Sequence, residues 1–307
     1  TEGVIWNQLL LFFFPIVLGT FFQQLYNTAD TIVVGRFVSK EALAAVGGSA
    51  AQIVGLIVGF FVGLASGASV IISQFYGAKN RVQLNRALHT AYAFSIIGSI
   101  FITVLGILIA PWMLELMHTP QETMADALLY LRIYFAGIIF VFIYNVGSSI
   151  LRAMGDSRRP LYYLIVCCIL NIVLDIVLVI VFHMGVAGVA WATLIAQGIS
   201  AVLSFLVLLR ELKRFPSGKT GIFSHTELLQ MTRIALPSIL QQSTVSIGMM
   251  LVQSVVNSFG SEALAGFSAA MRVESICIVP MTAFGNALSS YTAQNLGAKQ
   301  QERVVKG

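Results

Sequence analysis

The sequence predicts an all-α integral membrane protein, built as a helical bundle in two lobes. Its composition, its long apolar runs and an internal repeat carry this prediction. Of the 307 residues, 57% are hydrophobic and only 10% are charged, whereas soluble domains are about half apolar and a quarter charged. The composition therefore excludes a water-soluble fold.

Eight apolar runs, bounded by charged residues and glycines, are long enough to cross a membrane. A bilayer core about 30 Å thick requires roughly 20 apolar residues in one helix. We predict spans at Leu9–Val34, Ala44–Phe75, Ala87–Leu116, Leu128–Ile150, Leu161–Phe182, Val186–Leu209, Ile234–Val256 and Leu264–Thr292.

The basic residues predict how these spans are oriented. Fourteen of the 18 lysines and arginines fall in loops on one side of the membrane, and only Arg36 and Lys40 fall in loops on the other. Cytoplasmic loops carry such an excess of positive charge. We therefore expect a multi-pass protein of the cell membrane with a cytoplasmic N-terminus. The net charge of +5 serves orientation and does not indicate a nucleic-acid partner.

Three motifs recur near the start of the chain and again about 220 residues later. Six spans separate the two copies, so both copies enter the membrane from the same side and the repeat is parallel. The paired segments are Pro15 and Pro237, Glu41–Ala44 and Glu262–Ala265, and Gln74–Lys79 and Gln294–Lys299.

The repeat predicts the domain organisation. Residues 1–210 form an N-terminal lobe of six helices, residues 211–230 form a cytoplasmic linker, and residues 231–307 form the first two helices of a C-terminal lobe. By the arithmetic of the repeat, four further helices would complete the second lobe. We expect this sequence to be a fragment of a longer chain.

The two Gln-x-x-Gly-Ala-Lys motifs, together with Leu151–Pro160 after the fourth span, resemble the multidrug and toxin extrusion (MATE) family, in particular its DinF-like and MepA-like members. The resemblance covers the whole chain. It implies twelve helices in two bundles, and export of drugs or metabolites driven by inward flow of Na⁺ or H⁺.

Two acidic residues in the middle of predicted spans need a reason to be there. A carboxylate near the bilayer centre costs about 2.5 to 3.5 kcal/mol on insertion scales. Asp30 shares a helical stripe with Gln23 and Asn27, and Asp175 lies one turn after Asn171. Such oxygens suit Na⁺, and a dry carboxylate can alternatively hold a proton near neutral pH. An interfacial position for Asp30 and an interhelical hydrogen bond for Asp175 remain alternatives.

The family resemblance extends this set. It points to Asp30, Asn171, Asp175 and Thr193 as the cation-coupling residues of the N-terminal lobe, with Asn145 as a neighbour. The only metal ion expected there is Na⁺. In the second copy of the repeat, Asp30 falls opposite an apolar residue, so the ion site belongs to one lobe.

Other residues, including Gln23, Asn27 and Asn145, are candidates for substrate contact, gating or movement. Gln241 and Gln242 in the seventh span could face substrate or join helices by hydrogen bonds. Glu274 in the eighth span resembles an acid that family members place in the C-terminal lobe, where it could serve substrate binding or gating. Pro15 removes a backbone hydrogen bond within the first span. In the family, bending of this helix is proposed to follow protonation of its acid, although a static kink that aids packing is an equal alternative.

The second predicted span also carries a glycine at every fourth position. Such a ridge allows close approach of a neighbouring helix, so we expect it to face a helix and not a pore. The ridge consists of Gly55, Gly59, Gly63 and Gly67.

We therefore predict a secondary transporter that exports small cationic or amphipathic organic compounds in exchange for inward H⁺ or Na⁺. A flippase for lipid-linked sugars of a related fold and a transport-inactive fragment are the alternatives. The sequence contains no Gly-x-Ser-x-Gly or His-Glu-x-x-His motif, so we do not expect an enzyme. We expect no cofactor, a small-molecule substrate and membrane lipid as partners, and a monomer when the chain is complete.

Overall fold

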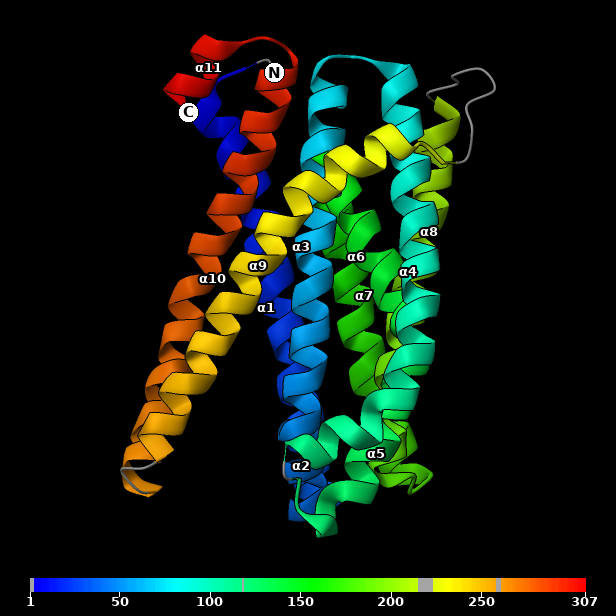
Figure 1. Ribbon diagram of the computed structural model, residues 1–307, viewed down its shortest axis with the longest axis vertical. Coiled ribbons are helices and arrows are strands. Elements are labelled where there is room, and N and C mark those ends of the chain that lie inside the picture. The colour runs from blue at the N-terminus through cyan, green and yellow to red at the C-terminus, as the bar shows by residue number, and fades with distance from the viewer. Residues whose placement is uncertain (1–2, 118, 215–222, 258–260) are drawn as a thin grey trace.

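The computed structural model is a bundle of long helices (Figure 1), with no strand among the residues that it describes. These are residues 3–117, 119–214, 223–257 and 261–307. The elements are α1 (Ile5–Phe37), α2 (Lys40–Gly47), α3 (Ser49–Gly77), α4 (Arg81–Leu116), α5 (Gln121–Ala136), α6 (Ile138–Ala153), α7 (Arg158–Asp175), the π-helix η1 (Ile176–Val181), α8 (Gly185–Arg214), α9 (His225–Asn257), α10 (Ser261–Gly297) and α11 (Gln301–Lys306).

Six of the eight predicted spans appear as helices of sufficient length and apolar character. Five meet both conditions outright: α1, α2 with α3, α4, α7 with η1, and α8. The predicted span Leu128–Ile150 is wrong as one continuous helix, because α5 and α6 meet at Gly137 with a bend of 51°. The pair counts as a sixth span that is broken in the middle.

The predicted seventh and eighth spans form α9 and α10, which are 33 and 37 residues long. At about 1.5 Å per residue, both can cross a bilayer core. Over the residues that the structure describes, neither belongs to the strongly apolar group, and Gln241–Thr244 interrupts the apolar run of α9. These two spans are therefore supported by length and by the repeat. Of the predicted linker, residues 215–222 lie outside the described residues.

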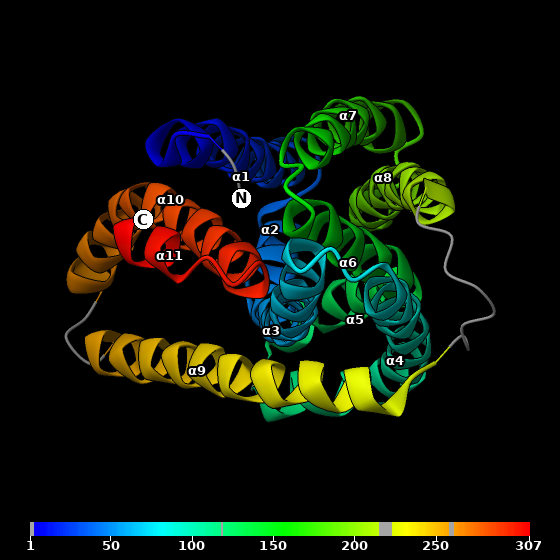
Figure 2. The ribbon, with the colours of Figure 1, turned by 90° about the horizontal axis from the view of Figure 1, so that it is seen from above.

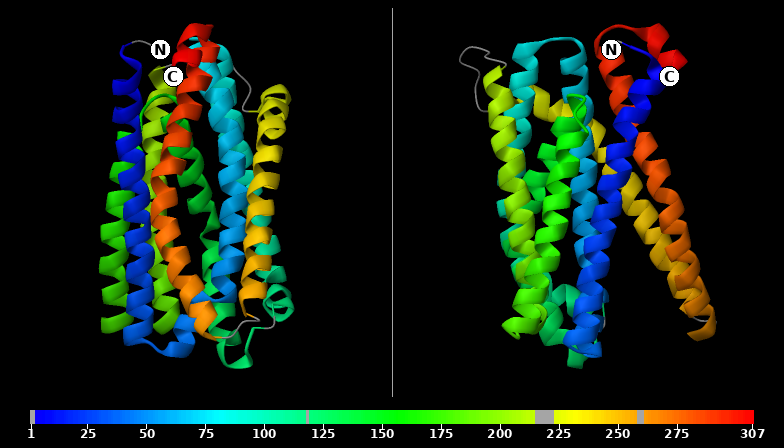
Figure 3. Two further views of the ribbon diagram at one scale, coloured as in Figure 1. Left: turned by 90° about the vertical axis from the view of Figure 1, so that its left-hand side faces the viewer. Right: turned by 180° about the vertical axis from the view of Figure 1, so that it is seen from behind.

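The two halves of the repeat meet at one end of the molecule. Both chain ends lie at this end, which is the top of Figure 1 and is called the upper end below. α3 packs against α9 and α10, and α1 packs against α10. Toward the opposite, lower end, α9 and α10 diverge from α1 and α3 (Figures 1 and 3), whereas α4 to α8 stay together on the far side of α3 (Figure 2).

The outer surface of the bundle is apolar. On α4, Ile97 is 62% exposed, Phe101 is 64% exposed and Leu108 is 72% exposed. Side chains of this kind are stable in contact with lipid tails, which offer no hydrogen bonds. The interior also holds apolar clusters, among them one that joins α2 to α6 around Ile53, Leu131 and Phe135.

The glycine ridge of α3 faces α9. A Cβ atom at Gly63 would come within 2.7 Å of Ile239, and a Cβ atom at Gly67 would come within 2.8 Å of Ala235. Gly59 faces Gln242 at an ordinary contact distance, and nothing lies within 4 Å of a Cβ atom at Gly55. The prediction that the ridge packs against a helix is confirmed at three of its four glycines.

Candidate functional site

Three helices bring four of the predicted residues into one buried cluster, called the carboxylate cluster below. α1 supplies Asp30, α7 supplies Asn171 and Asp175, and α8 supplies Thr193. The hydroxyl of Thr193 donates to Asp30 Oδ2 at 3.3 Å, and Asn171 Nδ2 lies 3.4 Å from the hydroxyl oxygen of Thr193. The carboxyl groups of Asp30 and Asp175 are close enough to interact electrostatically.

Local structure explains why these side chains converge. Asn171 and Asp175 are four residues apart on α7 and so lie on one face of it. α7 packs against both α1 and α8, which places that face opposite Asp30 and Thr193. Directly after Asp175 the backbone changes to the π-helix η1. π-helical turns are rare and often lie at functional sites.

Apolar side chains separate the carboxylate cluster from the lower end of the molecule. Val33 and Val34 follow Asp30 by about one turn and pack against Val179 of η1 and Val189 of α8. Asp175 has no exposed surface, and Asp30 is 9% exposed. The two acids therefore lie in a largely dry environment, where electrostatic interactions are stronger than in water.

Several oxygens of the cluster receive no hydrogen bond from the described residues. They are Asp30 Oδ1, Asn171 Oδ1 and both carboxyl oxygens of Asp175. Buried polar atoms are nearly always satisfied, and two adjacent buried carboxylates repel each other. A bound cation would satisfy these oxygens and offset the charge. The donor set, two carboxylates with an amide oxygen and a hydroxyl nearby, consists of the hard oxygen ligands that Na⁺ prefers, and it can equally hold a proton.

A second polar contact extends the cluster and was not predicted from the sequence. Gln197 Nε2 donates to the hydroxyl of Tyr26 at 3.3 Å, and both side chains are buried. Tyr26 lies one turn before Asp30 on α1, and Gln197 lies one turn after Thr193 on α8. Tyr26 and Gln197 each lie four residues from a predicted cluster residue, Asp30 and Thr193 respectively, and this spacing is the signal that could have identified the pair.

The predicted stripe on α1 is divided. Asp30 is buried, whereas Gln23 and Asn27 are exposed. Asn145 lies on α6. Its side-chain amide donates a hydrogen bond to the carbonyl of Val141 in the same helix at 2.7 Å, and not to a residue of the carboxylate cluster.

The candidates on the second half of the repeat also lie apart from the cluster. Gln241 and Gln242 are exposed on α9, and Glu274 is exposed on α10. Gln242 faces Gly59 of α3. Pro15 lies within α1, next to Ile16, whose side chain packs against Ala283 and Ala287 of α10.

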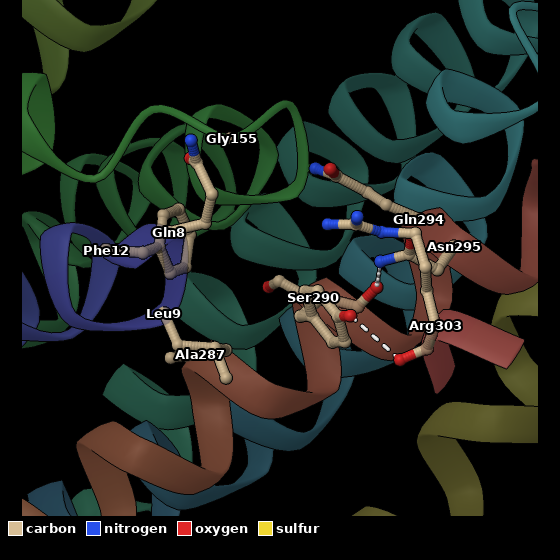
Figure 4. A pocket seen from close by; sticks show the side chains of 10 residues that line it. Gln8, Leu9, Phe12, Gly155, Ala287, Ser290, Gln294, Asn295 and Arg303 are labelled. Carbon is tan, nitrogen blue, oxygen red and sulfur yellow. Dashed lines mark hydrogen bonds between the residues drawn. The ribbon is translucent and has the colours of Figure 1, made fainter. Parts of the chain in front are cut away.

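A small cavity lies near the upper end, away from the carboxylate cluster. Its volume is about 90 Å³, and none of the predicted site residues lines it. Figure 4 shows Gln8 and Gly155 on one side of the cavity and Gln294 and Arg303 on the other. Among the described residues, no group of three or more His, Cys, Asp or Glu side chains is placed to hold a metal ion.

Comparisons with known proteins identify the family. The family model MatE matches residues 15–177 and 237–306. The chain is 34% identical over 306 residues to the probable multidrug resistance protein YpnP of Bacillus subtilis, covering 99% of this chain and 68% of that protein. It is 26% identical over 315 residues to the DNA damage-inducible protein F of Escherichia coli, covering 99% and 66% respectively.

A solved structure extends the likeness to the fold. It is described as the outward-facing conformation of a multidrug resistance MATE family transporter, and it superimposes with a TM-score of 0.89 at 28% identity, covering 99% of this chain and 68% of that chain. The present chain thus spans about two thirds of the length of these relatives. The resemblance drawn from the paired motifs is confirmed, and so is the predicted fold class. The chain belongs to the MatE family of multidrug and toxin extrusion proteins.

Proposed function

We propose that this chain forms part of a secondary active transporter that exports small cationic or amphipathic organic compounds in exchange for inward H⁺ or Na⁺. The carboxylate cluster carries the proposal. Asp30 and Asp175 are both buried, and Asp30 Oδ1 and both carboxyl oxygens of Asp175 receive no hydrogen bond from the described residues. Mid-membrane acids in such a setting mark ion pathways and proton relays.

The cluster can couple an ion to a helix movement because its ligands come from three helices. Binding a cation draws Asp30 of α1 and Asp175 of α7 together, and losing the cation leaves two carboxylates that repel each other. α1 therefore has two preferred positions relative to α7. Pro15, which lies within the contact of α1 with α10 between Phe13 and Ile16, is the proposed hinge.

The substrate path is proposed to lie between the two halves of the repeat. Gln23 and Asn27 are exposed on α1, and Gln241, Gln242 and Glu274 are exposed on α9 and α10. The relative from Bacillus subtilis is named a probable multidrug resistance protein, which supports organic compounds as the substrate class. A carboxylate such as Glu274 favours a cationic substrate.

The proposed setting is the cell membrane, with the upper end on the cytoplasmic side. The asymmetry of loop charges supports this orientation, and the exposed apolar surface of α4 supports direct contact with lipid. The chain is proposed to act as a monomer with an N-terminal lobe (1–210), a linker (211–230) and a C-terminal lobe beginning at residue 231.

Transport by the full-length protein in proteoliposomes tests the proposal. Efflux of a fluorescent organic cation is followed under an imposed Na⁺ gradient or an imposed H⁺ gradient, with Asp30→Asn and Asp175→Asn beside the parent protein. Glu41→Gln is the matched control, because Glu41 is an exposed acid outside the cluster. Binding of ²²Na⁺ to purified protein gives a readout that does not depend on the choice of substrate.

We expect one of the two gradients to drive efflux, and both cluster variants to abolish this coupling while the control keeps it. Folded Asp30→Asn and Asp175→Asn proteins that export as well as the parent would show that the two acids are structural. Saturable ²²Na⁺ binding that is lost in both variants would identify Na⁺ as the coupling ion.

A further inference from the structure

The repeated Gln-x-x-Gly-Ala-Lys motif ends α3 and α10 with the same backbone structure. In the first copy, Lys79 has a φ of 54° and its N–H donates to the carbonyl of Tyr76. In the second copy, Lys299 has a φ of 59° and its N–H donates to the carbonyl of Leu296. The following residue closes the motif in both copies, with Asn80 donating to Phe75 and Gln300 to Asn295. This is the Schellman pattern of a helix C-terminus.

The two motifs also pack directly against each other, with reciprocal contacts. A Cβ atom at Gly77 would collide with the backbone of Gln294, lying 2.7 Å from its carbonyl carbon and 2.9 Å from its Cα atom. A Cβ atom at Gly297 would collide with the backbone of Gln74, at 2.8 Å and 2.9 Å from the corresponding atoms. Each glycine therefore admits the backbone of the other motif, and any larger residue would force α3 and α10 apart.

Hydrogen bonds attach this contact to the end of α6. The carbonyl of Ala153 accepts from Gln294 Nε2 at 2.6 Å and from the hydroxyl of Ser73 at 3.3 Å. Ala153 is completely buried. The cavity of Figure 4 lies beside it, lined by Gly155 of the segment after α6 and by Gln294 and Asn295 of α10.

We propose that the two motifs form a clasp that closes the upper end of the molecule between the two halves of the repeat, and that the clasp opens when the substrate path opens to that side. The clasp is defined as Gln74, Gly77, Gln294 and Gly297. This proposal rests on the proposed transport function, because only an alternating transporter needs a closure that reopens.

Three features distinguish a reversible closure from static packing. The clasp joins the two halves at the end where they meet, while α9 and α10 diverge from α1 and α3 toward the other end (Figure 3). Between the two motifs themselves the contacts are backbone contacts, which are individually weak, and the side-chain hydrogen bond of Gln294 runs to α6. The Schellman cap of each motif satisfies its own helix end, so separating the motifs leaves both helix ends hydrogen-bonded.

Chemical modification of a cysteine beneath the clasp tests the proposal. The full-length protein is prepared with Cys167, Cys168 and Cys277 changed to alanine and with Ala153→Cys, and it is placed in proteoliposomes. A charged, membrane-impermeant maleimide is added from either side. Gly77→Ala, Gly297→Ala and the two substitutions together are then each introduced into this single-cysteine protein. Gly98→Ala is the matched control, because nothing lies within 4 Å of a Cβ atom at Gly98 of α4.

We expect Gly77→Ala and Gly297→Ala each to raise the rate of modification at position 153 about tenfold, from the side of the upper end only, since overpacking shifts the balance toward the open state. The double variant should add little to either single variant, because the two collisions open one contact. Gly98→Ala should leave the rate unchanged.

Equal rates in folded Gly77→Ala, Gly297→Ala and Gly98→Ala proteins would overturn the proposal. If the glycine variants do not fold, Gln294→Ala decides, because it removes the bond to Ala153 without adding an atom and should also raise the rate. The modification needs no transported substrate. If the glycine variants raise the modification rate but the protein exports no organic cation, the result would count against the proposed transport function. The clasp would then stand as a contact that opens.

Discussion

The glycine ridge of α3 allows a graded prediction, because its four members meet α9 at different distances. Gly→Ala in a helix adds about 0.5 to 1 kcal/mol of stability where the methyl group meets open space. Overpacking a filled contact costs about 1 to 3 kcal/mol. The sign of the change at each glycine is therefore set by what a Cβ atom would touch.

At Gly55 nothing lies within 4 Å, so alanine should stabilise the protein by about 0.5 to 1 kcal/mol. At Gly59 the nearest atom is Gln242 Cγ at 3.4 Å, an ordinary contact, and the helix gain should also prevail. At Gly63 the Ile239 side chain would lie at 2.7 Å and its backbone nitrogen at 3.1 Å. At Gly67 the carbonyl of Met231 and the backbone of Ala235 are in the way.

We therefore expect the melting temperature to rise or hold for Gly55→Ala and Gly59→Ala and to fall for Gly63→Ala. It should fall most for Gly67→Ala, because backbone atoms block the methyl group there and a rotamer change cannot relieve the contact. The assay is thermal unfolding of the four purified variants in one detergent, followed by tryptophan fluorescence. Four equal shifts, or a loss of stability at Gly55 as large as that at Gly67, would refute the assignment of this ridge to α9.

Three further predictions concern the cluster and the helix ends. Thr193→Val removes the hydroxyl that donates to Asp30 and should weaken cation binding about tenfold, as measured by ²²Na⁺ binding or by the gradient needed for efflux, whereas Thr193→Ser should restore it. Ser39→Ala should lower the free energy of unfolding by about 1 kcal/mol, because the Ser39 side chain caps the N-terminus of α2. Ser157→Ala is the control and should not show this loss, because the side chain of Ser157 makes no capping hydrogen bond at the start of α7. Glu211→Gln breaks an ion pair with Arg159 in which Arg159 is 39% exposed; it should cost less than about 1 kcal/mol, and this cost should shrink at high salt.

Much of the fold follows from apolar length, and the exceptions have local causes. The break between α5 and α6 falls at Gly137, inside a run that reads as one span. A Cβ atom there would lie 2.6 Å from Leu194 of α8, so the glycine admits a neighbouring helix that sequence periodicity does not reveal. The change to π-helix after Asp175 falls in the uniformly apolar segment Ile176–Val181, which contains no residue that predicts it.

The candidate site divides along similar lines. Acids in apolar spans are expensive, and this expense points to Asp30 and Asp175 in the first lobe, while Glu274 in the eighth span meets the same criterion and is exposed. The sequence could not predict that Gln23 and Asn27 are exposed while Asp30 is buried, because their spacing places all three on one face of a helix. Whether a position on that face is covered is decided by the neighbouring helices, which the spacing does not reveal.

The positions of the carboxylate cluster and the clasp determine how one could influence the other. The cluster uses α1, α7 and α8, and the clasp uses α3 and α10, so no clasp residue belongs to a helix that supplies a cluster residue. α1 contacts both groups of helices, because Asp30 lies in the cluster and Ile16 packs against Ala283 and Ala287 of α10. Pro15 lies within the contact with α10, next to Ile16, and removes a backbone hydrogen bond there. A change at Asp30 can therefore reach α10 along α1, and α10 carries Gln294 and Gly297 of the clasp. On this route, the ion acts on the clasp through the position of α1 and needs no direct contact with the clasp.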